Sequence, residues 1–225
     1  MIQIQKFGAS NSPNLWIITL GGRNISHNTW IHRLVTIGVR PLAKTPVTPN
    51  QLTTLRLAAG LAAAALFAMG DRGADFWASG VFILSLFLDR ADGILARITG
   101  RTSPFGHKYD LVADGLSNAS VFVGIGIGVR DGALGLWSLP LGVLAGGAVT
   151  VILWLVMRTE DRAGPRAAEL GGAAGFDPDD AMLAVPVAVL LGWATPLLLA
   201  AAVLAPAFAL FFFWRFRRHL AGGED

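Results

Sequence analysis

The chain has 225 residues, of which 53% are hydrophobic and only 15% are charged, and its formal net charge is +3. A soluble domain of ordinary composition carries roughly 25% charged residues, so this composition indicates that lipid surrounds much of the chain. The absence of cysteine excludes disulfides, thiol catalysis and thiolate metal sites. Any metal ion must therefore be held by oxygen or nitrogen ligands.

Residues 1–46 are predicted to form a cytoplasmic arm. The apolar run at 15–20 is too short for the hydrophobic part of a secretory signal, and no small-residue cleavage site clearly follows it. Between residues 29 and 44, Trp30 and Leu34 fall on one side of a helix, and Arg33 and Arg40 fall on the other. This pattern predicts a basic amphipathic helix at the membrane interface, with a surface helix packed on another part of the chain as the alternative.

Uncharged apolar runs near the ~20 residues needed to cross a bilayer predict six transmembrane helices. They lie at roughly 52–70, 75–92, 110–129, 134–157, 181–195 and 196–214. The last two come from one uncharged stretch, which as a straight helix would be about 51 Å long against about 30 Å for the hydrocarbon core. A turn near Gly192 and Pro196 removes the mismatch.

We therefore expect an all-α integral membrane protein with six transmembrane helices and an N-terminal amphipathic interfacial helix. The catalytic domain would cover 47–218, and a cytoplasmic tail would follow at 219–225. With six spans, all of the 18 Lys and Arg residues except Arg72 and Arg130 fall on one side. By the positive-inside rule that side is cytoplasmic, which predicts a multi-pass protein of the cytoplasmic (inner) membrane with both termini in the cytoplasm. We expect lipid as a partner, and no nucleic acid.

Four aspartates lie where the second and third predicted helices meet. Asp89 and Asp92 are three residues apart, and Asp110 and Asp114 are four apart, so each pair shares one face of its helix. The segment 99–106 between the pairs is rich in Gly, Pro, Ser and Thr and is predicted to be a turn that places the helices side by side. The four carboxylates would then converge on one pocket.

Such a cluster needs compensating charge. Two unit charges about 4 Å apart repel by about 4 kcal/mol at an effective dielectric constant of 20. Protonation or bound cations relieve this repulsion, and oxygen ligands at this density favour Mg²⁺, Mn²⁺ or Ca²⁺ over zinc or copper. The alternative is that the acids are interfacial, have no catalytic task and pair with basic neighbours. Those neighbours are Arg90, Arg97, Arg101 and Lys108.

These residues carry a family resemblance. The motif reads Asp89-x2-Asp92-Gly93-x2-Ala96-Arg97-x8-Gly106-x3-Asp110-x3-Asp114. At every fixed position it matches D-x2-D-G-x2-A-R-x8-G-x3-D-x3-D, the signature of the CDP-alcohol phosphotransferases. The chain resembles that family also in its six-span layout, its interfacial helix and the entry into the first span at 47–53. Residues 1–28 and the loop at 158–180 lie outside the resemblance.

The resemblance implies a fold and a reaction. Members have six transmembrane helices around a polar cavity that faces the cytoplasm, and they usually form homodimers. They transfer a substituted phosphate from a CDP-alcohol to an acceptor hydroxyl, with release of CMP, in phospholipid biosynthesis. In bacteria the donor is most often CDP-diacylglycerol.

The same resemblance implies roles for individual residues. Two divalent ions, Mg²⁺ or Mn²⁺, would bind, one to Asp89, Asp92 and Asp110 and the second to Asp89, Asp110 and Asp114. Asp114 would also be the general base. The residues implied at the nucleotide site are Asn50, Thr53, Gly93, Ala96, Arg97, Ser103 and Gly106, with Arg97 on the diphosphate. Taken alone, these residues are also typical of helix packing, of snorkelling to headgroups and of turns and helix starts.

The acceptor alcohol is left open by the sequence. Asp114 is followed by Gly115, and the run from Tyr109 departs from the Asp-Pro start associated with phosphatidylglycerophosphate synthases. His107 and Lys108 flank the acidic pocket and would suit an anionic acceptor, and the alternative is that they are solvated loop residues.

Gly124, Gly126 and Gly128 resemble a nucleotide-binding loop, but they lie in an apolar span with no preceding strand. They therefore predict close helix packing.

Two other classes of function are alternatives to a phosphotransferase. A metal-dependent membrane prenyltransferase also uses Asp-rich motifs and diphosphate substrates, but it would normally need more spans, two separated motifs and pyrophosphate release. A non-enzymatic ion or proton carrier would spread its acids along a path at mid-membrane depth. The acids here lie at helix ends instead.

Overall fold

The computed structural model describes residues 38–164 and 178–221. Within these residues the chain is all-α, as expected from the sequence, and its six α-helices are α2 (Pro49–Phe67), α3 (Arg72–Thr99), α4 (Pro104–Gly128), α5 (Ser138–Ala163), α6 (Ala184–Leu190) and α7 (Ala194–Ala221). Three short 3₁₀ helices accompany them: η1 (Leu42–Lys44), η2 (Gly135–Trp137) and η3 (Pro178–Leu183).

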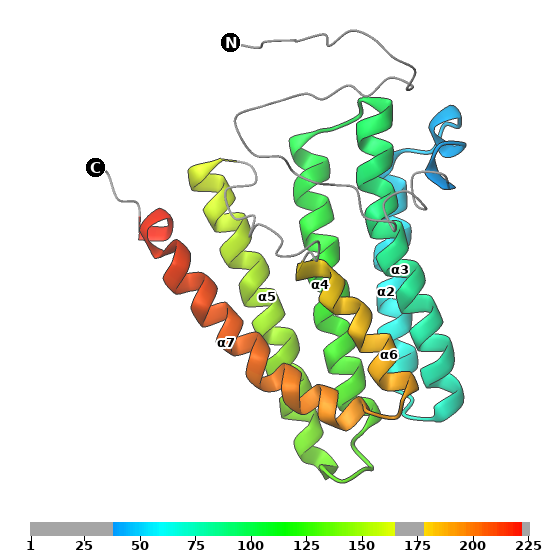
Figure 1. The fold of residues 1–225 in the computed structure, drawn as a ribbon, viewed down its shortest axis with the longest axis vertical. Coiled ribbons are helices and arrows are strands. Elements are labelled where there is room, and N and C mark those ends of the chain that lie inside the picture. Colours follow the sequence, from blue (N-terminus) through cyan, green and yellow to red (C-terminus); the bar gives the residue numbers. More distant parts are fainter. Residues whose placement is uncertain (1–37, 165–177, 222–225) are drawn as a thin grey trace, which may run out of the picture.

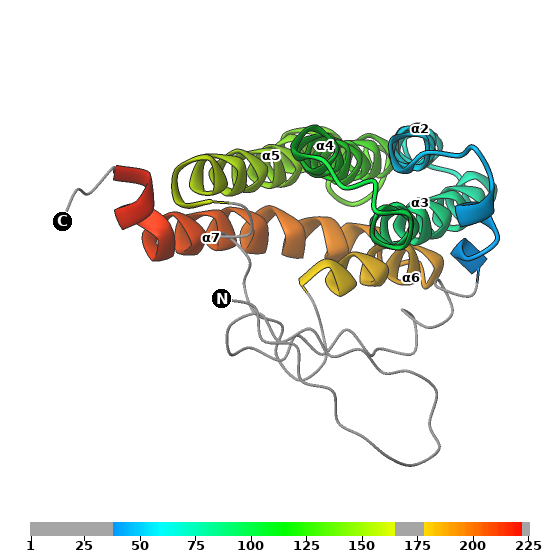
Figure 2. The ribbon, with the colours of Figure 1, turned by 90° about the horizontal axis from the view of Figure 1, so that it is seen from above.

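The helices form two layers. Seen from above, α5, α4 and α2 make one row, and α7, α6 and α3 lie on one side of it (Figure 2). Helix α4 packs against both α2 and α5, while α3 packs on α2 and α7 packs on α5. Because α2 to α5 run alternately down and up (Figure 1), the end of α3, the start of α4 and the end of α5 lie at the same end of the bundle.

Capping residues fix where the helices begin and stop near the start of α4. Thr48 is the N-cap of α2 and forms a capping box with Gln51. Helix α3 ends at Thr99 and is capped by Gly100, whose φ of +66° favours glycine. The Ser103 side chain caps α4 by accepting from the amide of Gly106. The turn between the helices is therefore shorter than the predicted 99–106, because both Thr99 and Gly106 are helical.

Small residues bring α2, α4 and α5 into backbone contact. A Cβ added at Gly124 would lie 2.2 Å from the carbonyl oxygen of Ala64, and one at Gly128 would lie 2.1 Å from that of Phe67. A Cβ at Gly126 would lie 2.8 Å from the carbonyl oxygen of Ser138 at the start of α5. The three glycines thus serve close helix packing, as the sequence predicted.

Three segments are long and apolar enough to cross a membrane, by length and composition: Pro104–Gly128, Gly135–Ala163 and Ala194–Arg217. The fifth predicted span is shorter than expected, because its apolar helical part is Ala181–Leu190. At about 1.5 Å per residue such a segment is about 15 Å long, half of the hydrocarbon core. The turn that separates it from α7 lies at Gly192, where φ is +79°. The count of six crossings stays a prediction.

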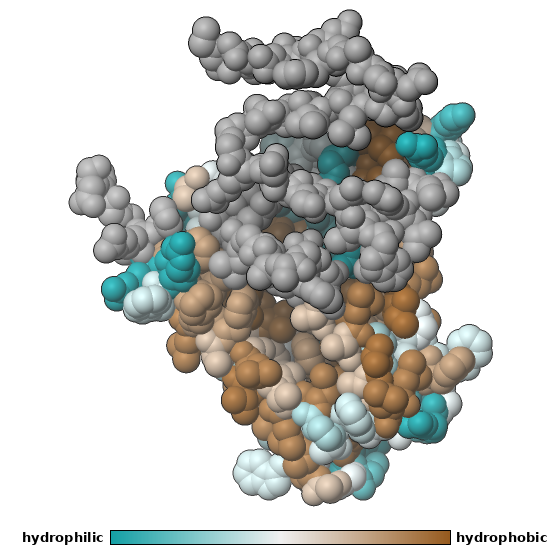
Figure 3. Space-filling view, viewed as in Figure 1, coloured by the Kyte–Doolittle hydropathy of each residue, from teal (hydrophilic) through white to brown (hydrophobic). Residues whose placement is uncertain are grey.

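The surface carries the apolar side chains expected of a membrane protein. On the face shown in Figure 3, hydrophobic residues cover most of the lower part of the bundle. Three tryptophans are at least 60% exposed at the end of the bundle where α3 begins: Trp77, Trp137 and Trp193. Tryptophan at that level is typical of a membrane–water interface.

The predicted interfacial helix at 29–44 lies mostly outside the described residues. In its described part, Val39 is buried and packs in a cluster with Leu52, Leu95 and two further residues of α3, and Leu42 lies against this cluster. These two apolar side chains therefore contact the bundle. The rest of the arm, residues 1–37, and part of the 158–180 loop and of the tail are not described by the structure.

Candidate active site

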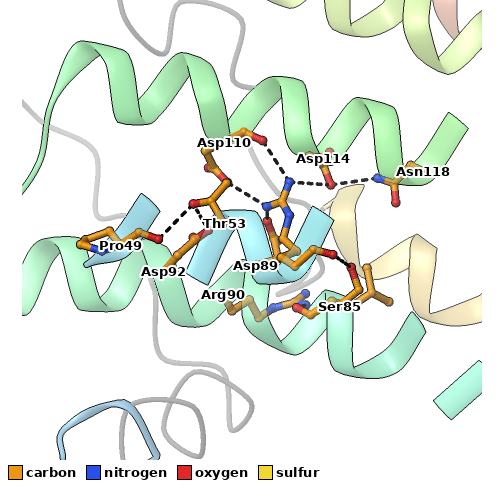
Figure 4. A network of polar contacts seen from close by, with 11 residues as sticks. Pro49, Thr53, Ser85, Asp89, Arg90, Asp92, Asp110, Asp114 and Asn118 are labelled. Carbon is orange, nitrogen blue, oxygen red and sulfur yellow. Dashed lines mark hydrogen bonds and ion pairs between the residues drawn. The ribbon is translucent and has the colours of Figure 1, made fainter. Parts of the chain in front are cut away.

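The four aspartates gather where α3 ends and α4 begins. Asp89 and Asp92 lie in the second half of α3, and Asp110 and Asp114 lie in the first half of α4. Because these helices run in opposite directions on either side of α2, the carboxylates approach one another near the first turns of α2 (Figure 4).

A buried arginine of α2 lies among three of these carboxylates. Nη1 of Arg56 donates to Oδ1 of Asp89 and, at 2.8 Å, to Oδ1 of Asp110. Nη2 donates to the backbone oxygen of Asp110 at 3.0 Å and lies 3.7 Å from Oδ1 of Asp114. Arg56 is 1% exposed, and it is the largest fully buried side chain of the described chain. The convergence of carboxylates is thus organised around a guanidinium group.

The fourth carboxylate is held by a hydroxyl. Oγ1 of Thr53 donates to Oδ2 of Asp92 at 2.7 Å, and Asp92 is buried. Thr53 precedes Arg56 by three residues, so both side chains lie on the same face of α2. One face of α2 therefore contacts aspartates of both α3 and α4.

A cavity of about 510 Å³ opens beside the aspartates. Its lining includes every residue predicted for the nucleotide: Asn50, Thr53, Gly93, Ala96, Arg97, Ser103 and Gly106. Asp92 and Asp110 also line it, whereas Asp89 and Asp114 lie at the Arg56 guanidinium. An added Cβ at Gly93 would meet only the tip of the Arg97 side chain, at 3.8 Å. The small residue therefore faces open cavity, and helix packing does not require it.

Two polar side-chain contacts join α4 to the end of α5 at the rim of this cavity. Nε2 of His107 lies 2.7 Å from Oε2 of Glu160, and Nζ of Lys108 donates to Oδ1 of Asp161 at 2.6 Å. All four side chains line the cavity. His107 and Lys108 lie in the first turns of α4, so they are helical residues with acidic partners and not solvated loop residues.

The donor chemistry of the cluster suits hard divalent cations. Within 38–164 and 178–221 no three His, Asp or Glu side chains are arranged to hold a metal ion. When all are ionised, however, the carboxylates of Asp89, Asp110 and Asp114 leave a formal charge of −2 around one guanidinium. Oxygen ligands with excess negative charge are those that Mg²⁺ and Mn²⁺ prefer. The four-aspartate ligand set fits such ions and stays a prediction.

The sequence patterns did not indicate Arg56 as a site residue, because Arg56 follows the basic bias of the predicted cytoplasmic side. A usable signal was present. Arg56 is the only charged residue between Lys44 and Asp71, and an arginine inside an apolar helix needs an acidic partner. Its spacing from Thr53 also places it on the face that carries the site.

Comparisons with known proteins support the family resemblance. The model of the CDP-alcohol phosphatidyltransferase family matches residues 46–215. An archaetidylinositol phosphate synthase of Pyrococcus horikoshii is 38% identical over 89 residues, which cover 40% of this chain and 46% of that protein. A phosphatidylinositol phosphate synthase of Streptomyces avermitilis is 34% identical over 91 residues, which cover 40% of this chain and 36% of that protein. The match thus spans less than half the length of either relative.

Solved structures share the fold. The phosphatidylinositol phosphate synthase of Mycobacterium tuberculosis with CDP-DAG bound has a TM-score of 0.64 at 22% identity, covering 84% of this chain and 94% of that chain. The same enzyme in complex with manganese and citrate has a TM-score of 0.62 at 21% identity, covering 84% and 89%. At such identities the similarity shows the fold alone.

Proposed function

The chain belongs to the CDP-alcohol phosphatidyltransferase family, and from that premise we propose that it transfers the phosphatidyl group of CDP-diacylglycerol to an acceptor alcohol. The observation that carries the proposal is the cavity, where all seven residues expected to contact the nucleotide lie beside two of the four aspartates. A donor with a nucleotide head and two acyl chains suits a polar cavity at the end of an apolar bundle.

The reaction assigns a task to each group. Arg97 donates to the diphosphate with its planar fork, and the small side chains of Gly93 and Ala96 leave room for the nucleotide. Asp114 accepts the proton of the acceptor hydroxyl. At the same time the oxygen of that hydroxyl forms a bond to the phosphorus that carries the lipid. The bond from that phosphorus to the bridging oxygen breaks, and CMP leaves with the electron pair.

Divalent ions belong to this proposal. Asp89, Asp92, Asp110 and Asp114 are the residues that would hold two Mg²⁺ or Mn²⁺ ions. When bound, such ions neutralise negative charge on the diphosphate oxygens and on the leaving group.

The relatives suggest the class of acceptor. The archaeal and the bacterial relative and the mycobacterial neighbour are each named as a synthase of an inositol phosphate lipid. We therefore propose a phosphorylated inositol as the acceptor. His107, Lys108 and Arg101 line the cavity and could face its phosphate, although His107 and Lys108 have acidic partners.

The setting of the reaction is the cytoplasmic membrane. We propose a homodimer of multi-pass chains with the cavity open to the cytoplasm, where CTP-derived donors and phosphorylated acceptors are present. The basic residues at the cavity end, among them Arg97, Arg101 and Lys108, support this orientation.

One assay tests the function. Purified protein is mixed with CDP-diacylglycerol and Mg²⁺ or Mn²⁺, and CMP release and the lipid product are followed with inositol phosphate, glycerol phosphate, free inositol, serine or choline as acceptor. We expect turnover that requires the metal and is fastest with inositol phosphate. Turnover with another alcohol would contradict the acceptor alone, whereas no CMP release with any alcohol would contradict the reaction. Pyrophosphate release from a prenyl diphosphate would instead support a prenyltransferase.

A further inference from the structure

The guanidinium of Arg56 has no task in the reaction above, yet it is the most deeply enclosed charge in the described part of the chain. Its 1% exposure means that hydration does not compensate its charge. The backbone of α2 at this residue is also tied to α3, because Oγ of Ser85 in α3 donates to the backbone oxygen of Arg56 at 2.9 Å. The side chain itself contacts Asp89 of α3 and Asp110 of α4.

Arg56 contacts one oxygen of each nearby carboxylate. The Oδ1 atoms of Asp89 and Asp110 accept from Nη1, and Oδ1 of Asp114 lies 3.7 Å from Nη2. A carboxylate has two oxygens with about four acceptor positions. Holding Asp89 and Asp110 through a single oxygen leaves each of them capacity for a further cation. The arginine can thus share these carboxylates with a metal ion.

Direct substrate binding does not explain this residue. The cavity is lined by Arg97 and Arg101, and its lining does not include Arg56. A phosphate in the cavity would meet those two arginines first. Arg56 instead acts on the substrate through the aspartates.

We propose that Arg56 is a positioning residue, a built-in counter-cation that holds Asp89, Asp110 and Asp114 together in the folded chain before a divalent ion binds. The inference rests on the proposed function, because it assumes that these aspartates hold the metal. Without the guanidinium, three carboxylates drawn from two helices repel one another, and the end of α3 moves away from the start of α4. A divalent ion supplies the missing positive charge.

A coupling between Arg56 and the metal follows. Loss of the arginine destabilises the metal-free protein more than the metal-loaded protein. By thermodynamic linkage the variant then binds the metal more tightly, since the carboxylates no longer share their charge with the guanidinium. Turnover falls nevertheless, because the aspartates are no longer fixed in their positions.

The test uses Arg56→Gln, which keeps hydrogen-bond donors and removes the charge. Thermal unfolding of the detergent-solubilised full chain is measured with EDTA and with saturating Mn²⁺, and Mn²⁺ binding is titrated by electron paramagnetic resonance. We expect Tm in EDTA to fall by about 6 °C or more, with less than half of that loss in Mn²⁺. Mn²⁺ should bind at least about tenfold more tightly than to the wild type. Equal losses of Tm in the two conditions would overturn the proposal.

Two further variants keep the test decisive. Arg72→Gln is the matched control, because Arg72 contacts a backbone oxygen, that of Leu190, at the opposite end of the bundle. Its effect on Tm should be the same with and without Mn²⁺. Arg56→Lys keeps the positive charge but replaces the planar guanidinium by a compact ammonium group. We expect a loss of Tm smaller than that of Arg56→Gln, and again smaller in Mn²⁺ than in EDTA. If Arg56→Gln does not fold, an equal loss for Arg56→Lys in both conditions overturns the proposal.

Measurements on the wild type distinguish failure of the proposed metal site from failure of the role of Arg56. If Mn²⁺ neither binds the wild type nor raises its Tm, the metal site of the proposed function fails and the role of Arg56 fails with it. If the wild type binds Mn²⁺ and Arg56→Gln behaves like Arg72→Gln, only the role of Arg56 is contradicted.

Discussion

Asp114 has a different environment from the other three aspartates. Its Oδ1 accepts from Nδ2 of Asn118 at 2.9 Å, one turn further along α4, and it is farther from Arg56 than Asp110 is. Its side chain is 43% exposed and lies outside the lining of the cavity, so the proposed acceptor would reach it from beside the nucleotide. A general base needs this combination of a fixed position and access.

We predict that Asp114→Asn retains binding of CDP-diacylglycerol and loses turnover by about 10²- to 10⁴-fold, because the amide cannot accept the proton of the acceptor hydroxyl. Donor binding and CMP release are measured on the same preparation. Asp131→Asn is the control, since the Asp131 side chain is 87% exposed at the far end of α4 and should not affect either quantity. Wild-type turnover in Asp114→Asn would remove the assignment of the base.

Thr53 offers a second test at the residue scale. Thr53→Val keeps the shape of the side chain and removes the donor to Asp92, which is 3% exposed. We predict a loss of about 1–3 kcal/mol in the free energy of unfolding, the range for a buried acceptor that loses its donor, and recovery in Thr53→Ser. Thr54→Val is the matched control, because the hydroxyl of Thr54 makes exposed contacts to Asn50 and Tyr109. Equal effects of the two valine substitutions on Tm would contradict the role of Thr53.

The sequence predicted the aspartates and not their counter-charge, and the reason is physical. Spacings of three and four residues place Asp89 with Asp92, and Asp110 with Asp114, on helix faces whatever the tertiary structure is. Which cation lies between those faces depends on how α2 packs against both helices. That packing follows from contacts far apart in the sequence, so the role of Arg56 required coordinates.

At the scale of elements, the site depends on how closely α2 and α4 pack, because Arg56 lies on one and Asp110 on the other. Gly124→Ala would place a Cβ 2.2 Å from the carbonyl oxygen of Ala64, which is backbone and can move only with its helix. We predict a loss of about 1–3 kcal/mol in stability from overpacking, together with reduced turnover. Gly147→Ala on α5 is the control, since no atom lies within 4 Å of the added Cβ. A Gly124→Ala protein with wild-type Tm would contradict the prediction, because it would show that α2 and α4 can move apart here without a loss of stability.

Helix boundaries show which signals in the sequence were sufficient. The break between α6 and α7 was predictable, because 34 uncharged residues exceed the width of the hydrocarbon core and Gly192 supplies the left-handed backbone. The short length of α6 was not, because residues 181–183 are as apolar as those of a transmembrane helix and hydropathy does not distinguish 3₁₀ from α geometry. In the structure these three residues belong to η3.

At the scale of the whole molecule, the two ends of the bundle differ in chemistry. One end has the aspartates, the cavity and the polar contacts at its rim, and the other, where Trp77, Trp137 and Trp193 are exposed, has Arg72 and Arg130 as its basic residues within the described chain. The two basic residues at the tryptophan end contact backbone oxygens: Arg72 that of Leu190, and Arg130 that of Ile127 at 2.9 Å. Both therefore satisfy helix ends, and their presence does not weaken the positive-inside argument.

This asymmetry predicts which end faces the cytoplasm, and the absence of cysteine makes the prediction easy to test. Asp131→Cys places a thiol in the exposed turn between α4 and η2, and Thr102→Cys places one in the exposed turn between α3 and α4. In intact bacterial cells a membrane-impermeant maleimide should label Asp131→Cys, and it should label Thr102→Cys only after permeabilisation. The cysteine-free parent controls for background. The reverse pattern would place the cavity outside the cytoplasm, where a nucleotide-activated donor is absent, and would contradict both the orientation and the proposed reaction.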